Sequence, residues 1–446
     1  MYKTLSAPHV LQIEVSSLCP NRCQHCYNFW RKSGGPVAHA SLSLGQANRI
    51  MDQIISRRVF HIVLTGGEPL LNKAVTLRIL ERAAIGSITT SLNSTLITLT
   101  ESNAIRLKDL RVSMVLTSLL GPSGDIHDEI AQRKLAFKET IHGIQILRNA
   151  GIPVSVNMVI SKKNKHLVRE TGDLVKSLGI NSFNATRAGC PGNCFDFSGL
   201  SLDLNEFRSY LEELHIFGEK NDMVVDVLSA YPLCGIKEVN RYQGFSSRRC
   251  MAGVNTLTIS ASGEVRPCTH LDMNYGNLLE EDLNDIWCKM TEWRDGSLIP
   301  STCHSCKVLP WCGGGCRMEA KMRNGSLCNI DPYASPSDAD YVLEQLRSRI
   351  KQDAPLPSVV RLNPKIRWRP ENFGAVVFAG TRFACYLNHE GFRWLQKIPS
   401  DMDFLTLDLI VRFGKMQEGF IEGLVLRKVL IPVSYTHLTL PTICSV

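Results

Sequence analysis

Six short runs of apolar and β-branched residues, separated by longer segments with helical periodicity, fill the first half of this 446-residue chain. The runs cover residues 11–15, 60–64, 88–92, 112–117, 154–160 and 182–186. Strands that alternate with helices in this way predict an α/β fold with a parallel sheet, either open or partly closed into a barrel. In such sheets ligands bind at the carboxyl ends of the strands.

Two chemically distinctive motifs stand at such strand ends. Cys19, Cys23 and Cys26 follow the first run in a C-x3-C-x2-C spacing, and the motif Thr-Gly-Gly-Glu-Pro at 65–69 follows the second run. The fold is expected to bring both motifs to one rim. Thiolates on a tight loop can hold one face of a cubane iron-sulfur cluster and leave one iron without a protein ligand. We expect that iron to bind a small molecule and cleave it reductively.

Composition narrows the class of protein. Sixteen cysteines in a long chain without a secretory N-terminal segment indicate metal or redox chemistry in a reducing compartment. No run of about eighteen apolar residues is present, so we expect a cytoplasmic protein without a membrane span. The formal net charge is +8, but the basic residues form no block, so nucleic-acid binding is not expected.

The pattern changes along the chain and predicts a multidomain protein. The strand-helix alternation is assigned to residues 1–225, and a region rich in cysteine, glycine and short turns to residues 226–350. The second region has too few apolar side chains for its own core, so metal or disulfides are expected to hold it.

The C-terminal part has a third pattern. Residues 356–432 predict a small α+β module with a β-hairpin and helices near 389–398, 403–413 and 417–428. The last residues, 433–446, look like the translated remnant of a library adapter. We therefore expect the natural C-terminus to be missing and Cys444 to carry no meaning. A frayed natural tail is the alternative.

The cysteine spacing resembles that of the radical S-adenosylmethionine (SAM) superfamily, and so does the strand-end motif that contains Gly66, Gly67, Glu68 and Pro69. The resemblance implies a partial (β/α)6 barrel in which the three leading thiolates hold a 4Fe-4S cluster, whose free iron binds the amino and carboxylate groups of SAM. The glycine pair lets backbone carbonyls approach the SAM ammonium group, and Glu68 adds charge to that contact. The family chemistry is reductive cleavage of SAM to a 5'-deoxyadenosyl radical, which abstracts hydrogen from a shielded substrate. A zinc knuckle is the alternative use of these thiols.

Three further positions resemble SAM-contacting residues of that superfamily less closely. Asn93 stands where relatives carry a T-N-G turn, although Ser94 replaces the glycine. The resemblance implies that Ser118 bonds the SAM ribose and Arg133 the SAM carboxylate. Leu120 replaces the usual aspartate, which puts an acid-base role at that position in doubt. Turn formation and helix capping are the alternative roles of these residues.

The spacing of seven more cysteines and one glycine resembles that of the SPASM domain, which binds auxiliary 4Fe-4S clusters. These residues are Cys250, Gly263, Cys268, Cys303, Cys306, Cys312, Cys316 and Cys328. The glycine is expected to let a hairpin turn tightly. The resemblance implies one cluster on Cys303, Cys306, Cys312 and Cys328, and most of another on Cys250, Cys268 and Cys316. The second of these clusters lacks a fourth ligand, for which Cys234 is the nearest candidate. If Cys234 is not a ligand, one iron of that cluster is open to substrate. A pair of zinc sites is the alternative.

Four remaining cysteines are less informative. Cys190 and Cys194 follow the sixth run near the expected barrel mouth, where they either touch substrate or are simply free or packed thiols. Cys288 and Cys385 stand in apolar surroundings and are expected to be core residues.

The C-terminal module resembles, less specifically, the small winged domain of the peptide chaperone of pyrroloquinoline-quinone (PQQ) biosynthesis. Such a domain binds the leader of a precursor peptide by adding it as a strand to a sheet edge. Tethering then raises the concentration of the core peptide near the radical. A dimerisation or packing domain without a ligand is the alternative.

We therefore predict a radical SAM enzyme of the SPASM subgroup that cross-links, oxidises or forms a thioether in a ribosomally made peptide. Its expected cofactors are SAM, one SAM-binding 4Fe-4S cluster and two auxiliary clusters. Its expected partners are the precursor peptide and a flavodoxin- or ferredoxin-type reductant. One alternative is the same chemistry in small-molecule or tetrapyrrole cofactor synthesis, and another is an iron-sulfur electron-transfer protein without turnover. No side chain stands out as a catalytic acid or base.

Overall fold

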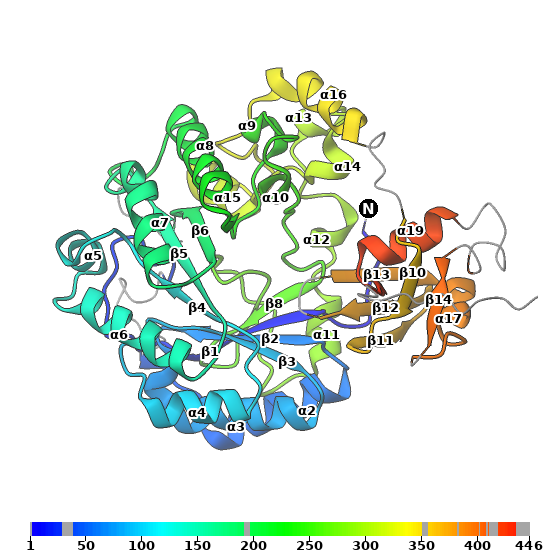
Figure 1. Cartoon of the computed structure of the whole chain (residues 1–446), viewed down its shortest axis with the longest axis horizontal. Coiled ribbons are helices and arrows are strands. Elements are labelled where there is room, and N and C mark those ends of the chain that lie inside the picture. The colour runs from blue at the N-terminus through cyan, green and yellow to red at the C-terminus, as the bar shows by residue number, and fades with distance from the viewer. Residues whose placement is uncertain are drawn as a thin grey trace, which may run out of the picture. The chain divides into compact units, whose positions relative to one another are not determined.

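The computed structural model describes residues 2–28, 39–190, 197–349, 356–380, 383–400, 402–406, 409 and 418–433. The chain divides into two compact units, Met1–Lys351 and Gln352–Val446 (Figure 1). In the described part of the chain, no helix is both long enough and apolar enough to cross a lipid bilayer. Cys194 and residues 434–446 of the expected adapter remnant lie outside the described residues.

A nine-stranded sheet forms the centre of the first unit (Figure 1). Its six central strands correspond to the six predicted runs and are β1 (Val10–Ser16), β2 (His61–Gly66), β3 (Thr89–Asn93), β4 (Val115–Ser118), β5 (Val154–Ile160) and β6 (Ser182–Arg187). They lie in chain order, and each neighbouring pair is parallel. The predicted parallel α/β sheet is therefore confirmed, and the carboxyl ends of β1 and β2 share one rim.

Three strands that the sequence pattern did not predict extend this sheet; they are β7 (Val224–Asp226), β8 (Thr256–Ile259) and β9 (Val265–Arg266). β7 pairs in parallel with β6, and β8 pairs in parallel with β1 on the side away from β2. β9 completes an antiparallel hairpin with β8. The cysteine-rich region therefore covers the edge of β1, whose backbone groups on that side need partners.

Helices flank this sheet in the order expected for strand-helix units (Figure 1). They are α2 (Leu44–Ser56), η2 (Pro69–Asn72), α3 (Lys73–Ile85), α4 (Glu101–Asp109), α5 (Gly124–Ala131), α6 (Ala136–Asn149), η3 (Lys165–Leu167), α7 (Val168–Ser177) and α8 (Leu204–Asn221). Local sequence fixes the starts of two of them. Ser43 and Gln46 form a capping box at α2, and Asp203 and Glu206 form another at α8.

Opposite faces of β1 differ in polarity because side chains alternate along a strand. Ile13 belongs to the apolar core, whereas Glu14 forms a 2.6 Å ion pair with Arg266 of β9. Both side chains are almost completely buried. Burial raises the pKa of Glu14 to about 7, against the attraction of the guanidinium group. This ion pair joins the first strand of the barrel to the cysteine-rich region.

The cysteine-rich region consists of short helices around the β8–β9 hairpin; they are α9 (Leu233–Ile236), α10 (Gln243–Ser246), α11 (Leu283–Cys288), α12 (Glu292–Asp295), α13 (Ser301–His304), α14 (Leu309–Cys312), α15 (Arg317–Asn324), η4 (Pro336–Asp338) and α16 (Ala339–Arg349). Gly263 lies between β8 and β9 with φ 88°, and a Cβ there would collide with the side chain of Asn277. The predicted tight hairpin turn is confirmed. The prediction that Cys288 is a core residue is wrong, because its neighbour Trp287 is buried instead and Cys288 is exposed.

The second unit contains two three-stranded antiparallel sheets, ordered β11-β12-β13 and β14-β10-β15. The strands are β10 (Val359–Leu362), β11 (Ile366–Glu371), β12 (Gly374–Ala379), β13 (Phe383–Asn388), β14 (Asp403–Leu405) and β15 (Leu430–Pro432), and the helices are α17 (His389–Leu395) and α19 (Glu418–Leu426). The predicted hairpin and two of the three predicted helices are present.

The helix predicted for residues 403–413 is wrong at its start. Asp403–Leu405 is strand β14, which pairs with β10, and residues 407–408 and 410–413 lie outside the described residues. Pairing with β10 decides the conformation of this segment, which local periodicity does not reveal. Cys385 is buried in the core of this unit, as predicted.

The buried Glu14–Arg266 pair gives a prediction for stability. Arg266→Ala leaves the Glu14 carboxylate buried without its partner, which should lower the free energy of unfolding by about 3–5 kcal/mol at pH 8. The pKa of Glu14 is already raised by burial, and it rises further without Arg266, so the ionised form is penalised in the folded state. The difference in free energy of unfolding between the unmodified protein and the variant should therefore increase from pH 5 to pH 8.

Urea unfolding of anaerobically reconstituted protein at both pH values measures this loss. The Glu14→Leu/Arg266→Met double variant is the matched control, since it removes both charges and should be closer to the unmodified protein in stability. Equal losses at both pH values, or a double variant less stable than Arg266→Ala, would contradict the interpretation.

Candidate functional site

The loop with Cys19, Cys23 and Cys26 begins where β1 ends, and its backbone is fixed at several points. The amides of Arg22 and Gln24 donate hydrogen bonds to the last carbonyls of α5, at Ala131 and Ile130, both at 3.0 Å. Within the loop, the amide of Cys26 donates to the carbonyl of Cys23, also at 3.0 Å. All three cysteines are partly exposed. The loop is therefore held in shape by the barrel and keeps its thiols accessible.

The glycine pair packs directly against the backbone that leads into this loop. The amide of Gly67 donates to the carbonyl of Ser16 at 2.6 Å, and the amide of Glu68 donates to the carbonyl of Leu18 at 2.7 Å. Gly66 has φ 127°, which only glycine adopts readily, and a Cβ on Gly67 would collide with the carbonyl of Leu18. The two motifs predicted to share a rim are therefore in contact.

Glu68 forms a network of hydrogen bonds with the turn after β3. Its side chain is fully buried and accepts hydrogen bonds from the amides of Leu70 and Thr95 and from the hydroxyls of Ser94 and Thr95, at 2.7–3.0 Å. Burial raises the pKa of Glu68, and these donors oppose that shift. In this structure the carboxylate fastens the end of β2 to the turn after β3, while Pro69 starts η2. Contact with SAM stays a prediction.

Sequence reasoning missed the role of Ser94 and Thr95. Ser94 appeared only as a departure from the glycine of the family turn, yet its hydroxyl donates to Glu68 and accepts from the amide of Leu96 at 3.0 Å. Asn93, the last residue of β3, precedes this network directly. The signal was available, because a serine or threonine at a strand end is a natural partner for a buried carboxylate nearby.

The other predicted SAM contacts lie at or after the end of β4. Ser118 is the last residue of that strand. Arg133 follows α5, and its guanidinium group forms a 2.6 Å ion pair with Glu139 of α6. His127 accepts a hydrogen bond from the amide of Leu120 at 3.2 Å, and burial lowers its pKa to about 4. His127 is therefore neutral at pH 7 and shapes the turn in which Leu120 replaces the family aspartate.

Two aromatic rings join the first cysteine loop to the cysteine-rich region. Tyr27, next to Cys26, lies 4.6 Å from His270 between ring centroids, and its hydroxyl lies 3.2 Å from that of Thr65. Nδ1 of His270 lies 3.8 Å from Sγ of Cys268. Burial, reinforced by Arg187 and Arg266, lowers the pKa of His270 to about 4, so this ring is neutral. None of these contacts was apparent from the sequence.

The end of β6 also meets the cysteine-rich region. Arg187 and Glu319 of α15 form a 2.9 Å ion pair with both side chains buried, and Glu319 also accepts from the amide of Cys190 at 3.0 Å. The Arg187 guanidinium group lies over the ring of Tyr333, 4.3 Å from its centroid. Cys190 is buried at this junction, and its expected companion Cys194 lies outside the described residues.

The cysteines of the second region form two groups by the electrostatic interactions of their thiols. Burial raises the pKa of Cys268 to about 11 and also raises that of Cys316, and the thiol of Cys250 adds to both shifts. Cys303, Cys306 and Cys312 interact with one another in the same way, around α13 and α14. Thiolates are the usual protein ligands of 4Fe-4S clusters, so both groups fit such a cluster chemically.

Cys234 and Cys328 occupy distinct positions relative to these groups. Cys234, in α9, is partly buried, and its thiol interacts with those of Cys312, Cys303 and Cys306. Cys328 is exposed, and its thiol lies 3.5 Å from the carbonyl of Ser297. In the described part of the chain, no three His, Cys, Asp or Glu side chains converge on the position of a single metal ion.

Two family models match the chain. The radical SAM superfamily model covers residues 13–175, and the SPASM model, described as an iron-sulfur cluster-binding domain, covers residues 250–307. The chain therefore carries a radical SAM domain followed by a SPASM domain, as the sequence motifs predicted. These domains imply SAM and 4Fe-4S clusters as cofactors.

Two of the curated relatives have different activities. The AdoMet-dependent heme synthase of Methanosarcina barkeri is 26% identical over 75% of this chain and 98% of its own length. The PqqA peptide cyclase of Granulibacter bethesdensis is 23% identical over 79% of this chain and 94% of its own length. The chain is thus similar both to a tetrapyrrole enzyme and to a peptide-modifying enzyme.

Solved structures share the fold. Native anSMEcpe with bound AdoMet has a TM-score of 0.60 and 17% identity, and covers 77% of this chain and 98% of its own. Streptococcus suis SuiB bound to its precursor peptide SuiA has a TM-score of 0.60 and 18% identity, and covers 73% of this chain and 75% of its own. The radical SAM type of partial barrel is therefore confirmed.

The close approach of Gly67 to Leu18 gives a prediction for the first cysteine loop. Gly67→Ala places a methyl group against the Leu18 carbonyl and should displace Cys19, the next residue. Reconstituted protein should then lose about four iron atoms per chain. Iron and sulfide analysis measures the loss. Gly199→Ala is the matched control, since no atom lies within 4 Å of its added methyl group. If Gly67→Ala keeps its full iron content, the contact between Gly67 and Leu18 is not needed to hold the cysteine loop.

Proposed function

We propose that this radical SAM protein with a SPASM domain cleaves SAM reductively and uses the resulting radical to modify a ribosomally synthesised peptide. The observation that carries the proposal is the contact between the three-cysteine loop and the glycine pair at one rim of the barrel. Similarity to PqqA peptide cyclase supports a peptide as the substrate. Cross-linking, thioether formation and side-chain oxidation are all within this chemistry.

The proposed division of labour follows the chain. Residues 1–225 form the radical SAM core, residues 226–350 bind two auxiliary 4Fe-4S clusters, and residues 356–432 bind the precursor peptide. The reductant is a flavodoxin- or ferredoxin-type protein. Residues 433–446 are proposed to be adapter-derived and to have no function.

In the core, Cys19, Cys23 and Cys26 would hold the SAM-binding cluster, which when bound supplies the electron that cleaves the SAM sulfonium. The glycine pair keeps the cysteine loop in place, and Glu68 fixes the adjoining turn after β3. The proposed SAM contacts are Asn93 and Ser118, the last residues of β3 and β4, Arg133 after α5, and the motif at the end of β2, which contains Gly66, Gly67, Glu68 and Pro69.

The second unit supports the peptide proposal by its architecture. β11 and β13 are the outer strands of a small antiparallel sheet, and an extended peptide can add to such an edge. Trp368 on β11 is 43% exposed and Tyr386 on β13 is 38% exposed, so both offer apolar surface beside those edges. The heme synthase of M. barkeri matches almost end to end yet covers only 75% of this chain.

Tetrapyrrole or other cofactor synthesis is the second candidate. It is favoured by the heme synthases, which are 24–26% identical over 72–75% of this chain. Both candidates use the same SAM chemistry, so the second unit distinguishes them. A non-catalytic electron-transfer protein is the third possibility.

Catalysis of SAM cleavage is directly testable. Anaerobically reconstituted and reduced protein should convert SAM to 5'-deoxyadenosine, because an iron without a protein ligand is open to SAM. Liquid chromatography measures the product. The Cys19→Ala/Cys23→Ala/Cys26→Ala variant should form none while keeping its auxiliary iron. A full complement of clusters without any product would favour the electron-transfer protein.

The role of the second unit gives a separate prediction. A chain that ends at residue 355 should bind the precursor about 100-fold more weakly, because tethering by the second unit is lost. The probe is the peptide encoded by a short open reading frame beside the gene, and fluorescence anisotropy measures its affinity. SAM cleavage by the truncated chain should continue, which serves as the control. Unchanged affinity would favour the tetrapyrrole candidate.

A further inference from the structure

Three polar side chains from neighbouring strands lie on one face of the central sheet. Asn93 of β3 is in register with Leu116 of β4, and Ser118 of β4 is in register with Asn157 of β5. Leu116 and Ser118 are two residues apart on one strand, so they point to the same face. Asn93, Ser118 and Asn157 therefore form a polar strip that crosses β3, β4 and β5.

This face of the sheet is the one that the first cysteine loop contacts. The hydroxyl of Tyr27, next to Cys26, lies 3.2 Å from the hydroxyl of Thr65 at the end of β2. Leu64 of β2 is in register with Leu92 of β3. The residues that follow them, Thr65 and Asn93, therefore share a face. The polar strip thus begins beside the loop that is proposed to hold the SAM-binding cluster.

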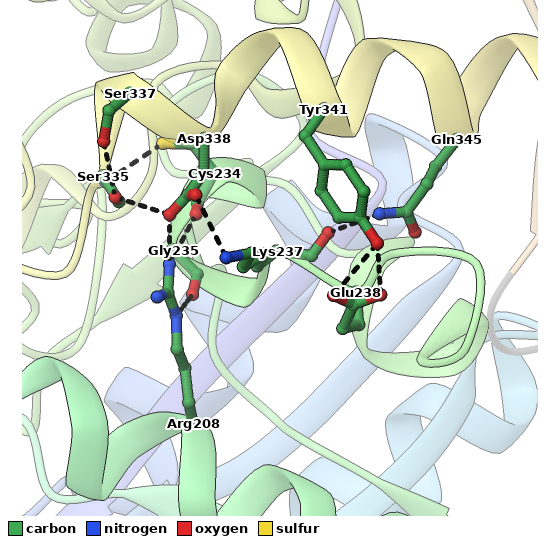
Figure 2. A network of polar contacts seen from close by, with 10 residues as sticks. All are labelled: Arg208, Cys234, Gly235, Lys237, Glu238, Ser335, Ser337, Asp338, Tyr341 and Gln345. Atoms are coloured by element: carbon green, nitrogen blue, oxygen red, sulfur yellow. Dashed lines mark hydrogen bonds and ion pairs between the residues drawn. The ribbon is translucent and has the colours of Figure 1, made fainter.

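Polar side chains elsewhere in the first unit pair with protein groups. One example is the network around Asp338, which joins α8 to α9 and η4 (Figure 2). Arg208 pairs with Asp338 at 2.7 Å and donates to the carbonyl of Gly235 at 2.9 Å. Asp338 also pairs with Lys237 at 3.4 Å. These groups satisfy one another, so the network has a structural role.

The polar side chains directly beside the strip are also paired. The hydroxyls of Ser155 on β5 and Ser182 on β6 lie 2.8 Å apart. The amide side chain of Asn184 donates to the hydroxyl of Ser155 at 2.8 Å and to the carbonyl of Val156 at 3.0 Å. These three side chains hold β5 and β6 together, as buried polar groups usually do.

The strip differs from these clusters in its hydrogen bonding. Within the ranges that the structure describes, the side chains of Asn93 and Ser118 are half-buried and form no hydrogen bond. Asn157 is only 8% exposed, and among the same described residues its side chain is bonded at Oδ1 alone. A donor as deeply buried as Nδ2 of Asn157 is normally satisfied. Its place in the strip indicates that a bound molecule supplies the acceptor.

The orientation of the Asn157 amide follows from a chain of hydrogen bonds. The backbone amide of Leu228, after β7, can only donate, and it lies 3.0 Å from Oγ1 of Thr186 on β6. The hydroxyl of Thr186 accepts this bond and donates its one proton to Oδ1 of Asn157 at 2.8 Å. The acceptor end of the Asn157 side chain is thereby used, and Nδ2 is the group left for a ligand.

We propose that Asn157 is a further binding residue of the barrel and that Thr186 positions it. Nδ2 of Asn157 donates a hydrogen bond to an oxygen of the molecule bound beside Ser118, and the Thr186 hydroxyl keeps the amide turned so that this donor is available. The oxygen belongs either to a hydroxyl of the SAM ribose, which Ser118 is proposed to bond, or to a carbonyl of the substrate. This inference rests on the proposed SAM chemistry.

Ligand binding by full-length, anaerobically reconstituted variants tests both roles. Asn157→Asp keeps the oxygen that accepts from Thr186 but replaces the donor by a second oxygen, so it should weaken binding of the contacted ligand about 10-fold to 100-fold. Thr186→Val removes the orienting hydroxyl and should weaken the same ligand about 3-fold to 10-fold. The double variant should bind no more weakly than Asn157→Asp, because Thr186 acts through Asn157.

Ser182→Ala is the matched control. It removes a hydroxyl from the same face of the sheet, but that hydroxyl is paired with Ser155, so ligand binding should not change. Equilibrium dialysis with labelled SAM and no peptide measures contact with the ribose. The KM for the precursor peptide encoded beside the gene, measured by mass spectrometry, reports contact with a substrate carbonyl. Iron analysis and circular dichroism check that each variant carries its clusters and is folded.

Weaker SAM binding by Asn157→Asp supports the proposal and assigns the oxygen to SAM, whereas unchanged SAM binding with a raised peptide KM assigns it to the substrate. Unchanged values for both, or an equal loss in Ser182→Ala, would overturn it. Additive losses in the double variant would overturn the role of Thr186. If the unmodified protein does not process the peptide, the SAM result alone decides. If the unmodified protein binds no SAM, the proposed function fails together with this inference.

Discussion

The backbone contact between the ends of β1 and β2 is the constraint on which the rest of the site depends. Gly67 and Glu68 donate their amides to the carbonyls of Ser16 and Leu18, so the chain enters the cysteine loop from a fixed direction. This contact requires glycine at 66 and 67, because a side chain at either position would collide with the backbone of β1 or of the residues after it. The same contact fixes the backbone immediately before Cys19, the first of the three thiols.

The cysteine-rich region is part of the same fold rather than an appended module. It supplies β8 to the free edge of β1, the Arg266 partner of Glu14, and the Glu319 partner of Arg187. Buried ion pairs of this kind contribute little net stability but strongly penalise any arrangement that separates the partners. The first cysteine loop and the group around Cys268 are therefore held in a fixed relation, with Tyr27 and His270 in contact between them.

Some elements of this fold follow from local sequence, and others form only through tertiary pairing. The six barrel strands were predictable, because alternation of apolar runs with helical periodicity is a local property. Strand β14 was not, because residues 403–405 become a strand only by pairing with β10. Cys288 was expected in the core on the strength of its apolar neighbours, yet helical geometry turns Trp287 inward and leaves Cys288 exposed.

The sequence by itself indicated the kind of chemistry, because the cysteine spacing and the glycine pair at a strand end resemble those of the radical SAM superfamily, whose family model matches residues 13–175. It also determined the two domains that the family models identify. Only the tertiary structure decided that Glu68 bonds to the turn after β3, that Arg187 pairs with Glu319, and that Tyr27 meets His270. The physical reason is that these contacts join residues far apart in the chain, and their distances are set by sheet order and packing, which no local pattern encodes.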